Sequence, residues 1–145
     1  MDQKQMTIYH FLFVMYLGYA HLTDKKVTEE EGVEIQRKAA RWFKVDHTNI
    51  DQFNKIMMES SAWYNSVETD KERYQLLMHV SENLGRVKDL DLQTRRDILS
   101  DLRDIAVADG RFGEREKQLH DVIGKNLGIN IMTSEDKDVS RKVGF

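Results

Sequence analysis

Apolar residues recur three and four positions apart along almost the whole chain, which is the spacing of one face of an α-helix. No stretch alternates with period two, and the sequence contains no proline, so the pattern predicts an all-α protein. Over residues 4–22 the side opposite the stripe is apolar too, which predicts a helix at the centre of the fold. The stripe consists of Ile8, Phe11, Leu12, Met15, Tyr19 and Leu22.

Five further helices are predicted by the same periodicity. Thr28 followed three residues later by Glu31 is the capping-box pattern, so the second helix is expected to start there. The fourth helix opens at Thr69 or Asp70. The other ranges are 29–43, 48–66, 92–108 and 114–127. We therefore expect one compact domain of six to seven helices over residues 1–130, followed by a polar tail over 131–145.

Several helix faces and aromatic pairs specify the expected core. The third helix places Ile50, Phe53, Met57 and Tyr64 on one face, and the sixth places Leu119, Val122, Ile123 and Leu127 on another. Trp42-Phe43 and Trp63-Tyr64 are adjacent pairs whose members cannot face the same way on a helix. We expect one member of each pair in the core and the other at the surface, as an anchor for a partner.

Composition narrows the class of protein. The chain has 145 residues, of which 40% are hydrophobic and 32% charged, as in a soluble single domain. It contains no cysteine, which removes disulfides and thiolate ligands, and a cytoplasmic location is expected. The net charge of −3 comes from intermixed acidic and basic residues, so nucleic-acid binding is not expected. The apolar first helix is shorter than a bilayer requires, so no membrane insertion is expected.

Two loops share a short pattern at an offset of 85 residues. Leu22-Thr23-Asp24 and Val107-Ala108-Asp109 each place an aspartate at the predicted end of a helix. Glu31 and Glu116 follow seven residues after the two aspartates, at the third residue of the next helix. The likeness predicts two pseudo-repeated halves, each a pair of helices joined by an acidic loop.

Two interpretations of these acidic residues remain open. A carboxylate at the third helical residue stabilises the helix start by ~0.3–1 kcal/mol, so Glu31 and Glu116 fit a structural role. Asp24 and Asp109 oppose the dipole at helix C-termini, and an Asx-type turn is one way to offset that cost. The other interpretation is a divalent cation, because the two loops together offer hard oxygen ligands. His21 is placed to add a nitrogen ligand.

The loops also carry a family resemblance. The segments AVADGRFGEREKQLHDVIGKNLGI and YLGYAHLTDKKVTEEEGVEI resemble the TerB-like family, the tellurite-resistance helical domains that are also fused to certain J-domain cochaperones. The likeness covers about residues 6–130. The aspartate–glycine motif is complete only in the second loop, because Lys25 stands where the first would have glycine.

The resemblance implies a function. It implies a TerB-like fold of two halves, a role in bacterial stress or tellurite resistance, and binding of a divalent metal ion (Ca, Mg, Mn or Zn) at Asp24, Glu31, Asp109 and Glu116. We therefore expect a non-enzymatic protein that binds a cation and another protein. Membrane-associated proteins are among the candidate partners. The alternative is an adaptor without metal, in which the acidic loops serve only as caps and turns.

The five histidines suggest no enzyme. His10 lies in the apolar run of the first helix and is expected to be a hydrogen-bonded core residue. His120 has Asp121 beside it and Glu116 four residues earlier, which favours an ion pair. No nucleophile stands at a defined spacing from a histidine and carboxylate, and no phosphate-binding glycine loop or metalloprotease motif occurs.

Overall fold

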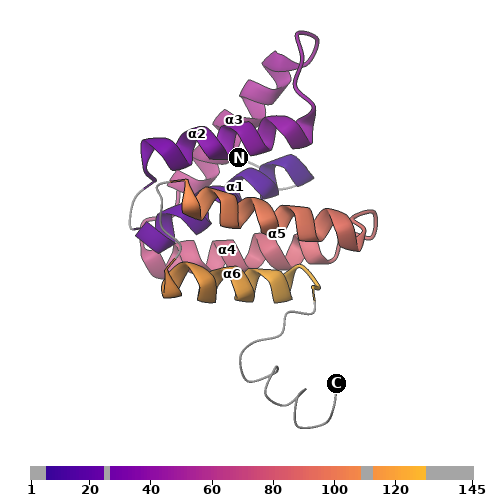
Figure 1. Ribbon diagram of the computed structural model, residues 1–145. Helices are drawn as coiled ribbons and strands as arrows, with labels where there is room; N and C mark the ends of the chain where they lie inside the picture. The colour runs from indigo at the N-terminus through magenta and orange to yellow at the C-terminus, as the bar shows by residue number, and fades with distance from the viewer. Residues whose placement is uncertain (1–5, 25–26, 109–112, 130–145) are drawn as a thin grey trace.

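The computed structural model describes residues 6–24, 27–108 and 113–129 (Figure 1). All the regular secondary structure within these ranges is helical. The prediction of an all-α fold is confirmed. The helices are α1 (Ile8–Asp24), α2 (Glu29–Phe43), α3 (Ile50–Asn65), α4 (Asp70–Gly85), α5 (Leu92–Val107) and α6 (Glu114–Asn126). Among them, no helix combines the length and the apolar character needed to cross a membrane.

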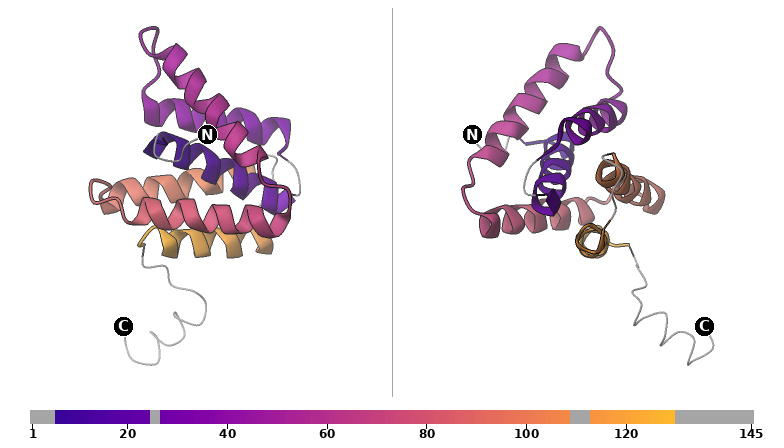
Figure 2. Two further views of the ribbon diagram at one scale, coloured as in Figure 1. Left: turned by 180° about the vertical axis from the view of Figure 1, so that it is seen from behind. Right: turned by 60° about the vertical axis from the view of Figure 1, so that its left-hand side comes forward.

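Helix α1 is the centre of the fold, as its two apolar sides predict. It packs against each of the other helices. In Figure 1 and the reverse view of Figure 2, α2 and α3 lie on one side of α1, and α4, α5 and α6 lie on the other. Residues from all sides of α1 are consequently buried, namely Leu12, Phe13, Val14, Met15, Tyr16, Tyr19 and Ala20.

Local hydrogen bonds explain where the helices begin. Thr28 caps α2, Thr69 caps α4 and Asp91 caps α5, each by accepting the backbone N–H of the third helical residue. Helix α1 differs from its predicted range: it starts at Ile8, after Thr7 donates its N–H to His10 Nδ1, and it continues to Asp24. The boundaries of the remaining helices lie within two residues of those predicted.

Helices α4 and α6 run parallel and approach closely at their C-terminal ends. Gly85 permits this approach, because a Cβ atom there would clash with the carbonyl oxygen of Asn126. Arg95 then joins the two ends by donating from Nη1 to the carbonyl oxygens of Gly85 and Leu127, both at 2.9 Å. One guanidinium group thus satisfies carbonyls left over at two helix ends.

Two expected core residues are partly at the surface. Ile50 is 39% exposed at the start of α3, and Val122 is 37% exposed on α6. Phe53, Tyr64, Ile123 and Leu127 are buried as predicted. The pairs α1–α2 and α5–α6 are two helix hairpins, while their symmetry as a repeat stays a prediction.

Candidate functional site

The helix ends that flank the two predicted acidic loops lie at one end of the molecule. The C-terminal ends of α1 and α5 and the N-terminal ends of α2 and α6 all lie there, on the left of Figure 1 and the right of the reverse view in Figure 2. The fold therefore gathers the four helix ends that the two loops connect.

Glu31 acts as a capping residue at this end. Its backbone N–H donates to Thr28 Oγ1 at 3.1 Å, and its Oε1 accepts the N–H of Thr28 at 3.0 Å. The predicted capping box is confirmed, and the side chain is fully buried. The structural interpretation therefore accounts for this carboxylate.

Glu116 repeats half of that arrangement at the start of α6. Its Oε2 accepts the N–H of Gly113 at 3.1 Å, while glycine offers no side chain for the reciprocal bond. A Cβ at Gly113 would lie 2.8 Å from this oxygen, so glycine lets the carboxylate approach. The backbone oxygen of Glu116 also accepts a 2.9 Å hydrogen bond from Tyr19, which ties α6 to α1.

The two aspartates of the predicted cation site lie at or beyond the limits of the described residues. Asp24 is the last residue of α1, but its side chain lies outside the described part of the structure, as does the whole of Asp109. Among the side chains that are described, no three His, Asp or Glu residues are grouped as metal ligands. Convergence of the two aspartates stays a prediction.

The histidines nearest these loops hold neighbouring groups. His21 Nδ1 lies 2.6 Å from the hydroxyl of Tyr64, and His120 Nε2 lies 3.1 Å from the carbonyl oxygen of Leu99. His10 is buried as predicted, and its Nε2 lies 3.2 Å from Glu59. All three therefore connect α1 or α6 to another helix.

A buried carboxylate, Asp101, forms a polar network that the sequence did not reveal. Asp101 is 2% exposed, and its Oδ2 accepts hydrogen bonds from the Tyr16 hydroxyl at 2.8 Å and from Trp42 Nε1 at 2.6 Å. Its Oδ1 accepts from Arg41 at 2.7 Å. Burial, followed by the nearby Asp101 charge, raises the pKa of the Tyr16 phenol well above its usual value.

Charged side chains continue this network between α2 and α5. Lys38 donates to Asp104 Oδ2 at 2.7 Å and lies 3.6 Å from both Asp101 and Glu34. The network thus joins the two hairpins.

The two aromatic pairs differ from each other. Tyr64 is buried and Trp63 is partly exposed, as predicted for one core and one surface member. Trp42 and Phe43 are both partly buried, so the predicted division does not hold for that pair, and the Trp42 indole is held by Asp101. The role of the outer member as an anchor for a partner stays a prediction.

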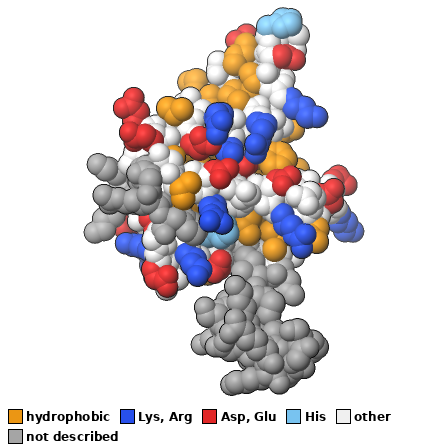
Figure 3. Space-filling model, in the orientation of Figure 1, with side chains coloured by type: hydrophobic (Ala, Val, Ile, Leu, Met, Phe, Trp, Pro, Cys, Tyr) orange, Lys and Arg blue, Asp and Glu red, His pale blue; other side chains and the backbone are white. Residues whose placement is uncertain are grey.

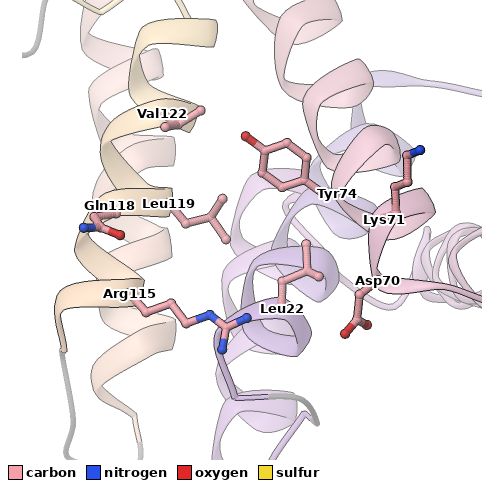
Figure 4. A pocket seen from close by; sticks show the side chains of 8 residues that line it. All are labelled: Leu22, Asp70, Lys71, Tyr74, Arg115, Gln118, Leu119 and Val122. Carbon is pink, nitrogen blue, oxygen red and sulfur yellow. The ribbon is translucent and has the colours of Figure 1, made fainter.

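A separate groove lies between α4 and α6, with the end of α1 at its floor (Figure 4). Its volume is about 490 Å³. Leu22, Tyr74, Leu119 and Val122 give it an apolar centre, and Tyr74 and Val122 are 45% and 37% exposed. Figure 4 shows the Tyr74 ring and the Leu119 side chain directed into the gap between the two helices.

Charged residues stand at one end of the groove. Lys71 and Asp70 lie in the first turn of α4, and Arg115 lies in the first turn of α6. The groove thus changes from charged near the starts of both helices to apolar further along them. Elsewhere, on the face in Figure 3, acidic and basic side chains are interspersed, without a basic stripe.

The spacing of apolar residues contained a signal for this groove. Ile123 and Leu127, at the end of α6, are buried in the core and Leu119 packs partly against it, whereas Val122 continues the apolar stripe into solvent. The apolar stripe is therefore wider than the buried face requires.

Comparison of the chain with protein-family models, curated proteins and solved structures finds no match.

Proposed function

We propose that this protein is a non-enzymatic interaction module whose groove between α4 and α6 binds an amphipathic segment of another protein. The observation that carries the proposal is the apolar centre of the groove, where the exposed Tyr74 and Val122 flank the partly buried Leu119 beside a charged end. Exposed apolar surface rimmed by polar groups is typical of a protein-binding site.

The dimensions of the groove suit a short helix. Arg115, Gln118, Leu119 and Val122 follow one face of α6 over about two turns, or ~10 Å. A partner helix that carries apolar residues three and four positions apart would cover this face. Lys71 and Arg115 outnumber Asp70 at the charged end of the groove, so acidic residues at that end of the partner would be favoured.

The test is a binding measurement with a synthetic amphipathic peptide. Its apolar residues are spaced three and four apart, and one end is acidic. We expect saturable fluorescence anisotropy with the native chain and at least ~10-fold weaker binding to Val122→Asp, because a carboxylate would be desolvated against the peptide.

Val33→Asp is the matched control, because Val33 is 61% exposed on α2 and does not line the groove. This variant should bind like the native chain. Equal binding by native protein, Val122→Asp and Val33→Asp would contradict the proposed site.

A divalent cation at the acidic end is the second candidate function. The convergence of four helix ends favours it, because the loops containing Asp24 and Asp109 join those ends, near the capping carboxylates of Glu31 and Glu116. Such oxygen ligands suit Ca²⁺, Mg²⁺ or Mn²⁺, and His21 would favour Zn²⁺. This proposal includes the TerB-like assignment and a cytoplasmic stress or tellurite-resistance role.

Isothermal titration of the metal-stripped protein with Ca²⁺, Mg²⁺, Mn²⁺ and Zn²⁺ tests the cation separately. We expect heat and thermal stabilisation with at least one ion, and loss of both in the Asp109→Asn, Glu116→Gln double variant. Absence of heat with every ion would exclude the cation, and equal binding by the double variant would exclude these ligands.

A further inference from the structure

We infer that the partner segment binds as a helix with its C-terminal end at Arg115, so that the groove selects helices whose last turn is acidic. This inference rests on the groove proposed above as the binding site. It adds the direction of the bound helix and the chemistry of its end.

The two walls of the groove run in the same direction. Helices α4 and α6 both start at the charged end, at Asp70 and Glu114 (Figure 4), and their C-terminal ends meet where Gly85 lies against Asn126. The start of a helix carries the positive end of its dipole, so two positive helix ends lie at the charged end of the groove. Helix α1 ends at the floor there, two residues after Leu22, and contributes one negative end. The helix ends at this place are therefore positive on balance.

The side chains that line this end add positive charge. Asp70, Lys71 and Arg115 line it, and Figure 4 shows Arg115 directed from α6 into the gap. The Asp70 carboxylate accepts a 2.8 Å hydrogen bond from Arg73, which offsets part of its charge within α4. Neither Lys71 nor Arg115 forms an ion pair with a carboxylate of the described residues. An acidic group of a partner would therefore meet two cations that no described carboxylate neutralises.

The other acids of the two first turns lie outside the lining of the groove. Glu72 and Glu116 are held in the helix caps, by the Thr69 hydroxyl and by the N–H of Gly113. Glu114 is exposed at the first position of α6. Their charges reduce the long-range potential of this end, but they leave the groove itself to its two cations.

The direction of the bound helix follows from these charges. A helix that has its C-terminal end at Arg115 brings a negative dipole end and unpaired carbonyl oxygens, to which the guanidinium can donate. The reversed helix would bring a third positive end to the same place. At the opposite end of the groove, Arg95 already donates to the carbonyl oxygens of Gly85 and Leu127, so that end distinguishes the two directions less. The charged end therefore decides the direction.

Two peptides of the same composition test the direction. Both are acetylated and amidated, have apolar residues three and four apart, and differ in whether the acidic residues occupy the last turn or the first. The same hydrocarbon staple on the solvent face of both equalises their helix content, which circular dichroism verifies. By fluorescence anisotropy we expect the peptide with the acidic last turn to bind ~5–10-fold more tightly.

A variant of the groove tests the cause of this preference. Arg115→Gln should reduce the preference by at least ~3-fold, because it removes the cation in the gap. Lys117→Gln is the matched control, since it removes the same charge from α6 but Lys117 is exposed outside the groove. This control should keep the native preference. A preference that Arg115→Gln leaves unchanged would overturn the inference.

A nitroxide label on the peptide with the acidic last turn shows its direction in NMR spectra of the protein. A label at the C-terminal residue of the peptide should reduce the amide peak intensities of Asp70 and Arg115. A label at its N-terminal residue should reduce those of Gly85 and Asn126 instead. The opposite pattern, or equal losses at both ends of the groove with either label, would overturn the inference.

Failure of this inference is distinguishable from failure of the proposed function. If both peptides bind equally and Val122→Asp weakens both, the groove is the binding site and the inference is wrong. If neither peptide binds, the proposed function is wrong and the inference falls with it.

Discussion

The buried carboxylate of Asp101 links three helices of the fold. It joins Tyr16 of α1, Trp42 and Arg41 of α2, and its own helix α5 through short hydrogen bonds. A buried charge is tolerated only where donors and an opposite charge compensate its lost hydration. Here they do so, and the hydrogen bonds fix α2 relative to α5.

Removal of the Asp101 carboxylate should therefore be costly. Asp101→Ala leaves the Trp42 indole and the Tyr16 hydroxyl without their acceptor, and we expect the free energy of unfolding to fall by ~3–5 kcal/mol. Urea denaturation followed by Trp fluorescence measures the change. Asp104→Ala is the control: its side chain is 46% exposed and its pair with Lys38 is partly solvated, so the loss should be at most ~1 kcal/mol. Equal losses would refute this role.

The Tyr64 phenol predicts a pH dependence at alkaline pH. Burial raises the pKa of Tyr64 to about 12. Unfolded tyrosine ionises near ~10, so the folded state keeps a proton that the unfolded state has already released. The stability from the neutral phenol is therefore complete below pH ~10 and is lost as the pH rises towards 12.

Urea unfolding at several pH values measures this loss. The native chain should lose more stability between pH ~10 and 12 than Tyr64→Phe does, because phenylalanine does not titrate. Tyr74→Phe provides the comparison at an exposed ring and should follow the native chain. Parallel curves for the native chain and Tyr64→Phe would show that Tyr64 does not cause the loss.

At the scale of elements, local signals predicted helices well and helix contacts poorly. Thr28 with Glu31 specified the start of α2, because a capping box depends only on neighbours in sequence. Gly85 was different: it ends α4 as an ordinary glycine would, and only the structure shows Asn126 against it. Approach of two helices depends on packing, which one segment does not encode.

Gly85 and Gly32 should respond oppositely to alanine. Gly85→Ala forces the carbonyl of Asn126 away, and we expect a loss of ~1–3 kcal/mol or more. A Cβ at Gly32 within α2 meets nothing within 4 Å, so Gly32→Ala should stabilise by ~0.5–1 kcal/mol through helix propensity. Thermal unfolding of both variants tests the contrast. A stable Gly85→Ala protein would contradict the close contact between α4 and α6.

At the scale of the whole molecule, apolar periodicity was enough to predict the class of fold and the central place of α1. It did not predict the Asp101 network, because Tyr16, Trp42 and Asp101 are far apart in sequence and each has an ordinary local interpretation. Periodicity wrongly placed Val122 in the core for a related reason. An apolar stripe shows that a residue is apolar, but not whether a neighbouring helix covers it. Glu31 was correctly interpreted as a cap.

The proposed function depends on the exposed part of the apolar stripe on α6, which leaves an apolar groove between the parallel helices α4 and α6. NMR mapping of the full chain during titration with the amphipathic peptide tests this most directly. We expect the largest chemical-shift changes at Leu22, Tyr74, Leu119 and Val122, and we expect them to saturate. Saturable changes confined to other helices, or no changes at these four residues, would contradict the proposed function.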